Sequence, residues 1–252
     1  MNSTRTTTLI LGLSAFALAC GQQPTPEEYD DIATGVAGLV SDNPGSETEA
    51  ISDGMEAAHG EVPSGLSRSG MGSISGKRGT VDYSFEVTCQ DAAGATLAPC
   101  DETTDSARLV LDVQGTIDTA RYDAELSRTG DWQIVGLTGE TATLDGSGTF
   151  DVESEFMAIF RNETRTFVLD YDARYDAVQI RTADEVPVAG TIEYDVHAKQ
   201  TKSRTFRDIE REIDVNAVVT FDGSGAAQLV LDGERRYSVD LKDGTVALES
   251  SD

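Results

Sequence analysis

The feature that most constrains the fold is an alternation of apolar and polar residues that begins near Ser64 and continues to the end of the chain. Helical periodicity largely disappears there. Segments in which every second residue is apolar, such as 192–198, are separated by turns that contain glycine. A strand with this pattern has one apolar face to bury and one polar face that tolerates water. The sequence therefore predicts a mainly β domain built from antiparallel strands.

A short phrase of glycine, threonine, an apolar residue and an acid occurs four times in this region. The four copies start at Gly79, Gly115, Gly148 and Gly190. Glycine adopts positive φ without strain and threonine favours strands, so each copy is expected to turn the chain and open a strand. Residues 145–148 and 222–225, both Asp-Gly-Ser-Gly, are expected to be further hairpin turns.

The spacing of these phrases is irregular, which does not fit a solenoid of equal repeats. We instead predict an antiparallel meander of about ten strands, because a sheet of this size has to curl or stack to bury its apolar face. A curved sheet, a half-barrel and an up-and-down barrel all fit the pattern.

Helical signals are confined to residues 26–63. Thr25 and Glu28 form one predicted capping box, and Ser46 and Glu49 form a second. An Asn-Pro-Gly run between them, and a glycine after the second, are expected to end the two helices. We predict a short helical hairpin with an apolar side to bury; a partly ordered stalk is the alternative.

The first 20 residues have the pattern of a secretory signal. Polar residues with Arg5 precede an apolar run at 9–19, which is far shorter than the ~20 apolar residues of a spanning helix. The run ends in Ala-Leu-Ala followed by Cys20. Here the chain resembles bacterial lipoprotein precursors, whose lipobox ends in a small residue and a cysteine.

The resemblance implies cleavage before Cys20, diacylglycerol on the Cys20 sulfur and an acyl chain on its amino group. Gly21 after the cysteine implies export to the outer membrane. An ordinary signal peptide with a chance cysteine is the alternative. The predicted organisation is a signal peptide (1–19), a lipidated tether (20–25), a helical segment (26–63) and an antiparallel β domain (64–252).

The chain is strongly acidic, with a formal net charge of −26 and four lysines. Such a charge repels nucleic acid and anionic membrane surfaces, so we expect no nucleic-acid partner. Three interpretations remain for the acidic surface. It could be simple solvation, adaptation to a salty habitat, or a site for cations or a basic partner.

Cys89 and Cys100 remain once Cys20 is assigned to lipid. An even pair in an oxidising compartment predicts a disulfide. That bond would contribute about 3 kcal/mol by constraining the unfolded chain. A metal site is the alternative, although no histidine lies near and two thiolates do not fill a zinc shell.

Other candidate sites are sparse. Asp170, Asp172 and Asp176 could offer oxygen ligands to calcium, although acid-rich turns are common in an acid-rich chain. His59 and His197 lack a partner pattern for zinc or for a serine nucleophile, and we expect both at the surface. No catalytic motif is found, so we assign no catalytic residue and no cofactor; an enzyme that uses carboxylates alone would leave no such motif.

These features predict a lipid-anchored binding or structural lipoprotein of the bacterial cell envelope, held on the outer membrane and facing the periplasm or the exterior. One version is a carrier of an apolar ligand, similar in layout to periplasmic lipoprotein-sorting proteins, which have a curved sheet closed by helices. The alternative is a surface module that binds protein or polysaccharide through the polar face of its sheet. The expected partners are thus the membrane, through Cys20, and either an apolar ligand or a macromolecule.

Overall fold

The computed structural model describes residues 23–42, 46–118, 122–158, 163–204 and 207–249. Its elements are α1 (Pro26–Val40), α2 (Glu47–Ala58), β1 (Leu66–Gly70), β2 (Ser73–Arg78), β3 (Val81–Gln90), β4 (Thr96–Leu97), β5 (Ser106–Asp118), β6 (Tyr122–Val135), β7 (Thr141–Ala158), β8 (Glu163–Arg181), β9 (Val186–Arg204), β10 (Arg207–Phe221), β11 (Ala226–Leu231), β12 (Arg235–Asp240) and β13 (Val246–Leu248). The mainly β prediction is confirmed.

Both predicted helices form, and each begins at its predicted N-cap; the complete capping box is present at α1, and at α2 the Ser46 half of the box is present. The Thr25 hydroxyl accepts the Glu28 N–H at 3.3 Å, and the Glu28 carboxylate accepts the Thr25 N–H at 2.7 Å, which completes the first capping box. The Ser46 hydroxyl accepts the Glu49 N–H at 3.0 Å at the start of α2. The Asn-Pro-Gly run expected to end α1 lies outside the described residues.

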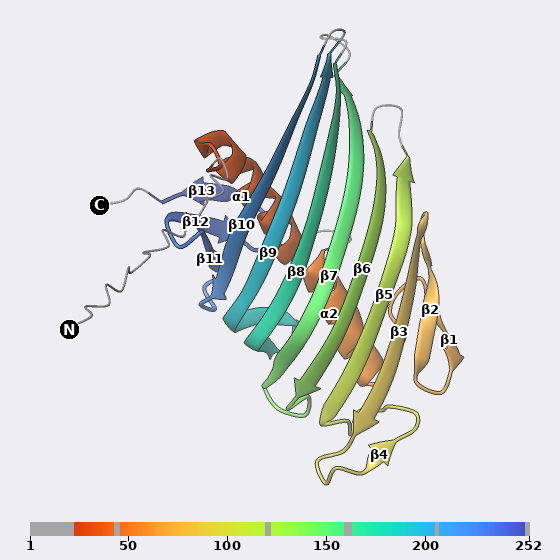
Figure 1. The fold of residues 1–252 in the computed structure, drawn as a ribbon. Coiled ribbons are helices and arrows are strands. Elements are labelled where there is room, and N and C mark those ends of the chain that lie inside the picture. Colours follow the sequence, from red (N-terminus) through yellow and green to blue (C-terminus); the bar gives the residue numbers. More distant parts are fainter. Residues whose placement is uncertain (1–22, 43–45, 119–121, 159–162, 205–206, 250–252) are drawn as a thin grey trace, which may run out of the picture.

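The strands form one antiparallel sheet in which neighbours follow the order of the chain, except that the two-residue β4 pairs beside β3. The sheet is curved and open, with β1 and β13 at its edges (Figure 1). The predicted meander and curved sheet are confirmed, with 13 strands rather than about ten. The extra strands include β1 and β2, whose serine- and glycine-rich sequences lack alternation. They still pair, because the backbone hydrogen bonds of a ladder do not require apolar side chains.

The repeated glycine phrase has a different role from the one predicted. Only the copy at Gly79 precedes a strand; the copies at Gly115, Gly148 and Gly190 lie inside β5, β7 and β9. The turn predicted at 145–148 is also wrong, because these residues lie inside β7. A Cβ at Gly115 would lie 2.8 Å from the Val81 Cα, so glycine here permits close approach of neighbouring strands. The turn predicted at 222–225 is confirmed between β10 and β11.

Gly190 marks an irregularity in the sheet. Its φ is +95°, and a Cβ there would lie 2.3 Å from the Ala177 carbonyl oxygen. The β8–β9 register shifts between Asp176 and Gln179, beside this position. The glycine therefore serves a bulge within a continuous strand, where the sequence alone indicated a turn.

The two helices lie across the same face of the sheet, which we call the inner face (Figure 1). α1 contacts β11, β12 and β13, and α2 contacts β3, β5 and β9. Helix residues such as Ile32, Val36, Ile51 and Met55 pack with alternate strand residues, among them Trp132, into a single core. Each large apolar side chain buried in this way contributes about 1.5–3 kcal/mol. The opposite, outer face of the sheet carries the polar residues.

We predict that Gly190→Ala lowers the free energy of unfolding by about 2–4 kcal/mol, because the new Cβ collides with backbone and its φ is strained. Gly35→Ala is the matched control: nothing lies within 4 Å of a Cβ there, and the gain in helix propensity should stabilise the protein by up to about 1 kcal/mol. Urea denaturation measures both. Equal stability of the two variants would contradict the bulge assignment.

Candidate functional site

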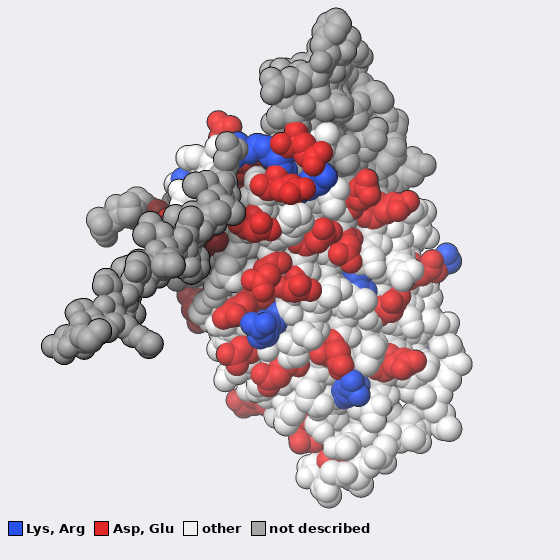
Figure 2. Space-filling view, in the orientation of Figure 1, with Lys and Arg blue, Asp and Glu red and all other residues white. Residues whose placement is uncertain are grey.

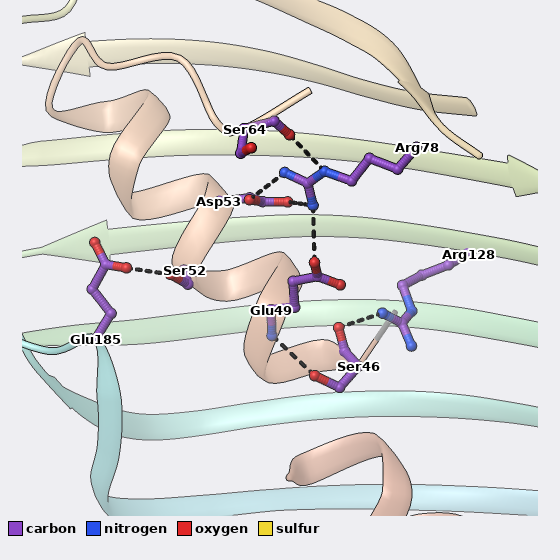
Figure 3. Close-up of polar contacts among 8 residues, drawn as sticks. All are labelled: Ser46, Glu49, Ser52, Asp53, Ser64, Arg78, Arg128 and Glu185. Atoms are coloured by element: carbon purple, nitrogen blue, oxygen red, sulfur yellow. Dashed lines mark hydrogen bonds and ion pairs between the residues drawn. The ribbon is translucent and has the colours of Figure 1, made fainter. Parts of the chain in front are cut away.

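A row of polar side chains on α2 faces the sheet (Figure 3). Arg78, at the end of β2, donates two hydrogen bonds to the Asp53 carboxylate at 2.7 and 2.8 Å and one to Glu49 at 3.1 Å. Its Nε donates to the Ser64 carbonyl at 2.7 Å. Burial raises the pKa of the Asp53 carboxyl, and Arg78 opposes that shift without cancelling it. This ion pair therefore fixes α2 against the edge of the sheet at some cost in desolvation.

A second polar contact lies deep beneath the first turn of α2. The Glu47 carboxylate is 2 % exposed and accepts hydrogen bonds from Tyr194 at 2.5 Å, Tyr175 at 2.8 Å and Tyr171 at 3.4 Å. Burial, followed by the nearby Glu47 charge, raises the pKa of all three tyrosines well above the ordinary value. The tyrosines therefore stay protonated and act as donors that hold the helix on β8 and β9.

Arg128 of β6 belongs to the same region. It is 5 % exposed, its Nη1 donates to the Ser46 carbonyl at 2.9 Å, and its guanidinium lies 4.8 Å from the centre of the Phe150 ring. Neither Arg128 nor Glu47 was singled out from the sequence. The available signal was an arginine at the apolar parity of a strand; the same signal marks Arg211, which pairs with Glu28 of α1 at 2.8 Å.

A hollow of about 350 Å³ remains between the helices and one end of the sheet. We call it the helix–sheet hollow. It is lined by Val40, Asp42, Thr48, Glu49, Ser52, Asp184, Glu185, Val186, Pro187, Gly225, Leu241 and Lys242. These residues come from the end of α1 and the segment after it, α2, the β8–β9 turn, the start of β9, the β10–β11 turn and the segment after β12. Its volume falls in the lower range of small-molecule sites.

On the outer face, acidic side chains are spread among neutral residues and outnumber the basic ones (Figure 2). The register of the strands places some carboxylates directly opposite one another. Three such pairs are Asp151 with Asp170, Asp172 with Asp195, and Glu125 with Glu153. Like charges in this arrangement destabilise a sheet by tenths of a kcal/mol per pair. Partial burial and the nearby Asp170 and Asp172 raise the pKa of the Asp151 carboxyl.

Three basic side chains on the outer face are paired with acids. The pairs are Arg108 with Asp131 at 2.7 Å, Arg174 with Glu193 at 3.4 Å, and Lys199 with Glu210 at 2.8 Å. Two open hollows, of about 730 and 540 Å³, lie among the carboxylates of strands β3 to β9. The remaining acids of this face thus give it a strongly negative potential.

The structure brings together some of the residues predicted as sites. Cys89 and Cys100 form the expected disulfide, with their Cα atoms 5.5 Å apart. Asp170, Asp172 and Asp176 lie on the same parity of β8, with Arg174 between the last two. Among the residues that the structure describes, no three His, Cys, Asp or Glu side chains are placed to hold a metal ion. Cys20 lies outside the described residues.

The two histidines differ in their surroundings. The His59 ring lies 3.5 Å from the Leu137 carbonyl oxygen at the end of α2. His197, on the outer face of β9, pairs with Asp214 at 2.7 Å. The hydrogen bond to Asp214, together with the charges of Asp170 and Glu212, raises the pKa of His197 above 6.5.

We therefore predict that His197 titrates above pH 6.5 and that Asp214→Asn lowers its pKa, as measured by NMR. The sign follows from linkage: the protonated ring favours the fold fully below the unfolded-state value, and this contribution is lost as the pH rises through the folded-state pKa. Asp243→Asn, which removes an exposed carboxylate elsewhere, should leave the titration unchanged. A His197 pKa insensitive to Asp214→Asn would contradict the pairing.

No helix among the described residues is long and apolar enough to cross a bilayer. A scan against models of protein families, a search of curated proteins and a search of solved structures find no match to this chain. Its function has to be argued from its own geometry.

Proposed function

We propose that this chain is a lipid-anchored binding protein of a bacterial cell envelope, and that the outer face of its sheet binds a positively charged protein. The observation that carries the proposal is the set of carboxylates held directly opposite one another across β6 to β9. Each pair costs free energy in the isolated protein. A partner rich in lysine and arginine would convert that repulsion into attraction and would be steered to the face over long range.

The two faces of the sheet are not equally available. The inner face is covered by α1 and α2 over much of its width, whereas the outer face carries no helix in the described part of the chain. No described aromatic side chain is exposed on the outer face; the large apolar residues exposed there are Val110 and Val135. Sugar rings are commonly held by stacking on aromatic rings, so this composition favours a protein over a polysaccharide.

The proposed anchor determines which end of the protein lies at the membrane. Cys20 precedes α1 by six residues, which reach roughly 20 Å when extended. Lipid at Cys20 would therefore keep the start of α1 close to the membrane surface. Two acyl-type attachments on one cysteine give durable membrane binding.

The outer-face proposal predicts that Asp→Asn replacement of Asp151, Asp170, Asp172 and Asp195 weakens binding of a fluorescent ten-residue lysine peptide by about tenfold at low salt. The free energy of unfolding of the same variant should be higher by about 1 kcal/mol, because like-charge contacts are relieved. Fluorescence anisotropy and urea denaturation measure the two effects.

The control for that variant changes net charge by the same amount away from the outer face. It carries Gln or Asn at four exposed acids: Glu27, Asp31, Glu102 and Asp243. Its affinity for the peptide should fall less than threefold. If both variants lose affinity equally, the acids act only through net charge, as in a solvated or salt-adapted surface, and the proposed binding face is wrong.

The anchor predicts that the full chain, expressed in a bacterial host, incorporates an alkyne-labelled fatty acid and sediments with membranes. Cys20→Ala should abolish both, because the acceptor sulfur is removed, whereas Gln22→Ala should change neither. A wild-type chain that stays unlabelled would show that the leader is an ordinary signal peptide.

A carrier is the second candidate function, and the helix–sheet hollow is the observation that favours it. Side chains of both helices pack against the inner face in a single core. A ligand enclosed between helices and sheet would thus be small.

A further inference from the structure

We propose that the helix–sheet hollow binds a small organic cation, a primary amine carried on a short hydrocarbon chain. This inference deepens the second candidate function by naming the class of ligand. It uses no residue of the outer face, so either site can fail without the other.

The hollow has an apolar wall that suits a hydrocarbon chain. Val40, Val186, Pro187 and Leu241 line it, and Val40, Pro187 and Leu241 are buried within the fold. The lining comes from the end of α1, the start of β9 and the segment after β12. A chain of a few methylene groups could cover these side chains without disturbing the packed core.

The hydroxyl groups of the hollow offer acceptors rather than donors. The Ser52 hydroxyl donates its proton to the Glu185 carboxylate, and the Thr48 hydroxyl donates to the Val40 carbonyl at 2.9 Å. Once their protons are used in this way, only oxygen lone pairs remain for a ligand. A protonated primary amine has three donors and no acceptor, so its hydrogen-bonding groups complement this lining.

Charge points to the same class. The hollow is lined by Asp42, Glu49, Asp184 and Glu185 against a single Lys242. Glu49 is engaged by Arg78, and both oxygens of Asp184 are engaged by Arg181 at 2.7 and 2.9 Å. Asp42 and Glu185 form no ion pair with a described lysine or arginine, and Glu185 is the half-buried one of the two, with Ser52 as its hydrogen-bond donor.

Glu185 is also held in an unfavourable state. Its backbone has φ +57°, a left-handed conformation that is strained for a residue with a side chain. Burial raises the pKa of its carboxyl, followed by the charges of Glu61 and Asp53, while Ser52 and His59 oppose the shift. A half-buried carboxylate that is not paired with a described lysine or arginine is stabilised by a bound ammonium group, which supplies a positive charge directly.

The experiment titrates the purified protein with n-pentylamine and follows backbone amide shifts by NMR. The expected result is saturable shifts centred on Ser52, Glu185 and Val186, with n-pentanol at least tenfold weaker. Glu185→Gln should weaken amine binding at least tenfold. Asp184→Asn is the matched control in the same turn and should change the affinity less than twofold, because that carboxylate is already neutralised by Arg181.

Glu185→Gly is a second variant that distinguishes loss of the binding carboxylate from loss of folding. Glycine suits the positive φ at this position, so this variant should fold at least as well as the original while losing the carboxylate and the amine affinity. Lys242→Met should tighten amine binding, since it removes a cation that competes for the same acids.

Three results would overturn the proposal. The first is equal affinity for n-pentanol and n-pentylamine, which would leave an apolar carrier site in place of a cation site. The second is an equal loss of affinity in Glu185→Gln and Asp184→Asn, which would reduce the effect to net charge. The third is the absence of saturable shifts in the hollow, which would remove the carrier function as well.

Discussion

The requirement to cover one face of a long open sheet with two short helices governs the rest of this structure. α1 has 15 residues and α2 has 12, yet together they contact strands from β3 to β13. They do so by lying across the strands and by adding polar contacts to their apolar packing. Carboxylates on the helices meet arginines and tyrosines on the inner face, as in Asp53 with Arg78 and Glu47 with Tyr175.

These buried polar contacts give position more than stability. Replacing a buried ion pair with apolar residues is often neutral, whereas leaving one partner alone is costly. The pairs therefore penalise any shift of the helices along an inner face whose apolar surface would tolerate several placements. In this arrangement of the helices, the helix–sheet hollow lies beside the contact between Ser52 and Glu185 (Figure 3).

Most of the fold could be predicted from the sequence, because strand periodicity and capping boxes are local signals. They predicted β10, β11, β12 and both helices. The internal glycines were misread because a glycine needed for a turn and one needed for close strand approach look the same without knowledge of the neighbouring strand. Glu185 was equally hidden, since its partner Ser52 is 133 residues away in sequence. Cross-strand acid pairs also depend on register, which a list of acids does not contain.

The outer face and the hollow share one physical property, although they lie on opposite sides of the sheet. In each, a carboxylate is placed in unfavourable surroundings: Asp151 and Asp170 face one another across the ladder of β7 and β8, and Glu185 is half-buried beside the hollow. A flexible acidic surface would spread its charges and lose little free energy in water. A carboxylate held in a sheet ladder or half-buried beside it cannot move away from its surroundings, so under both proposals a bound cation would stabilise it.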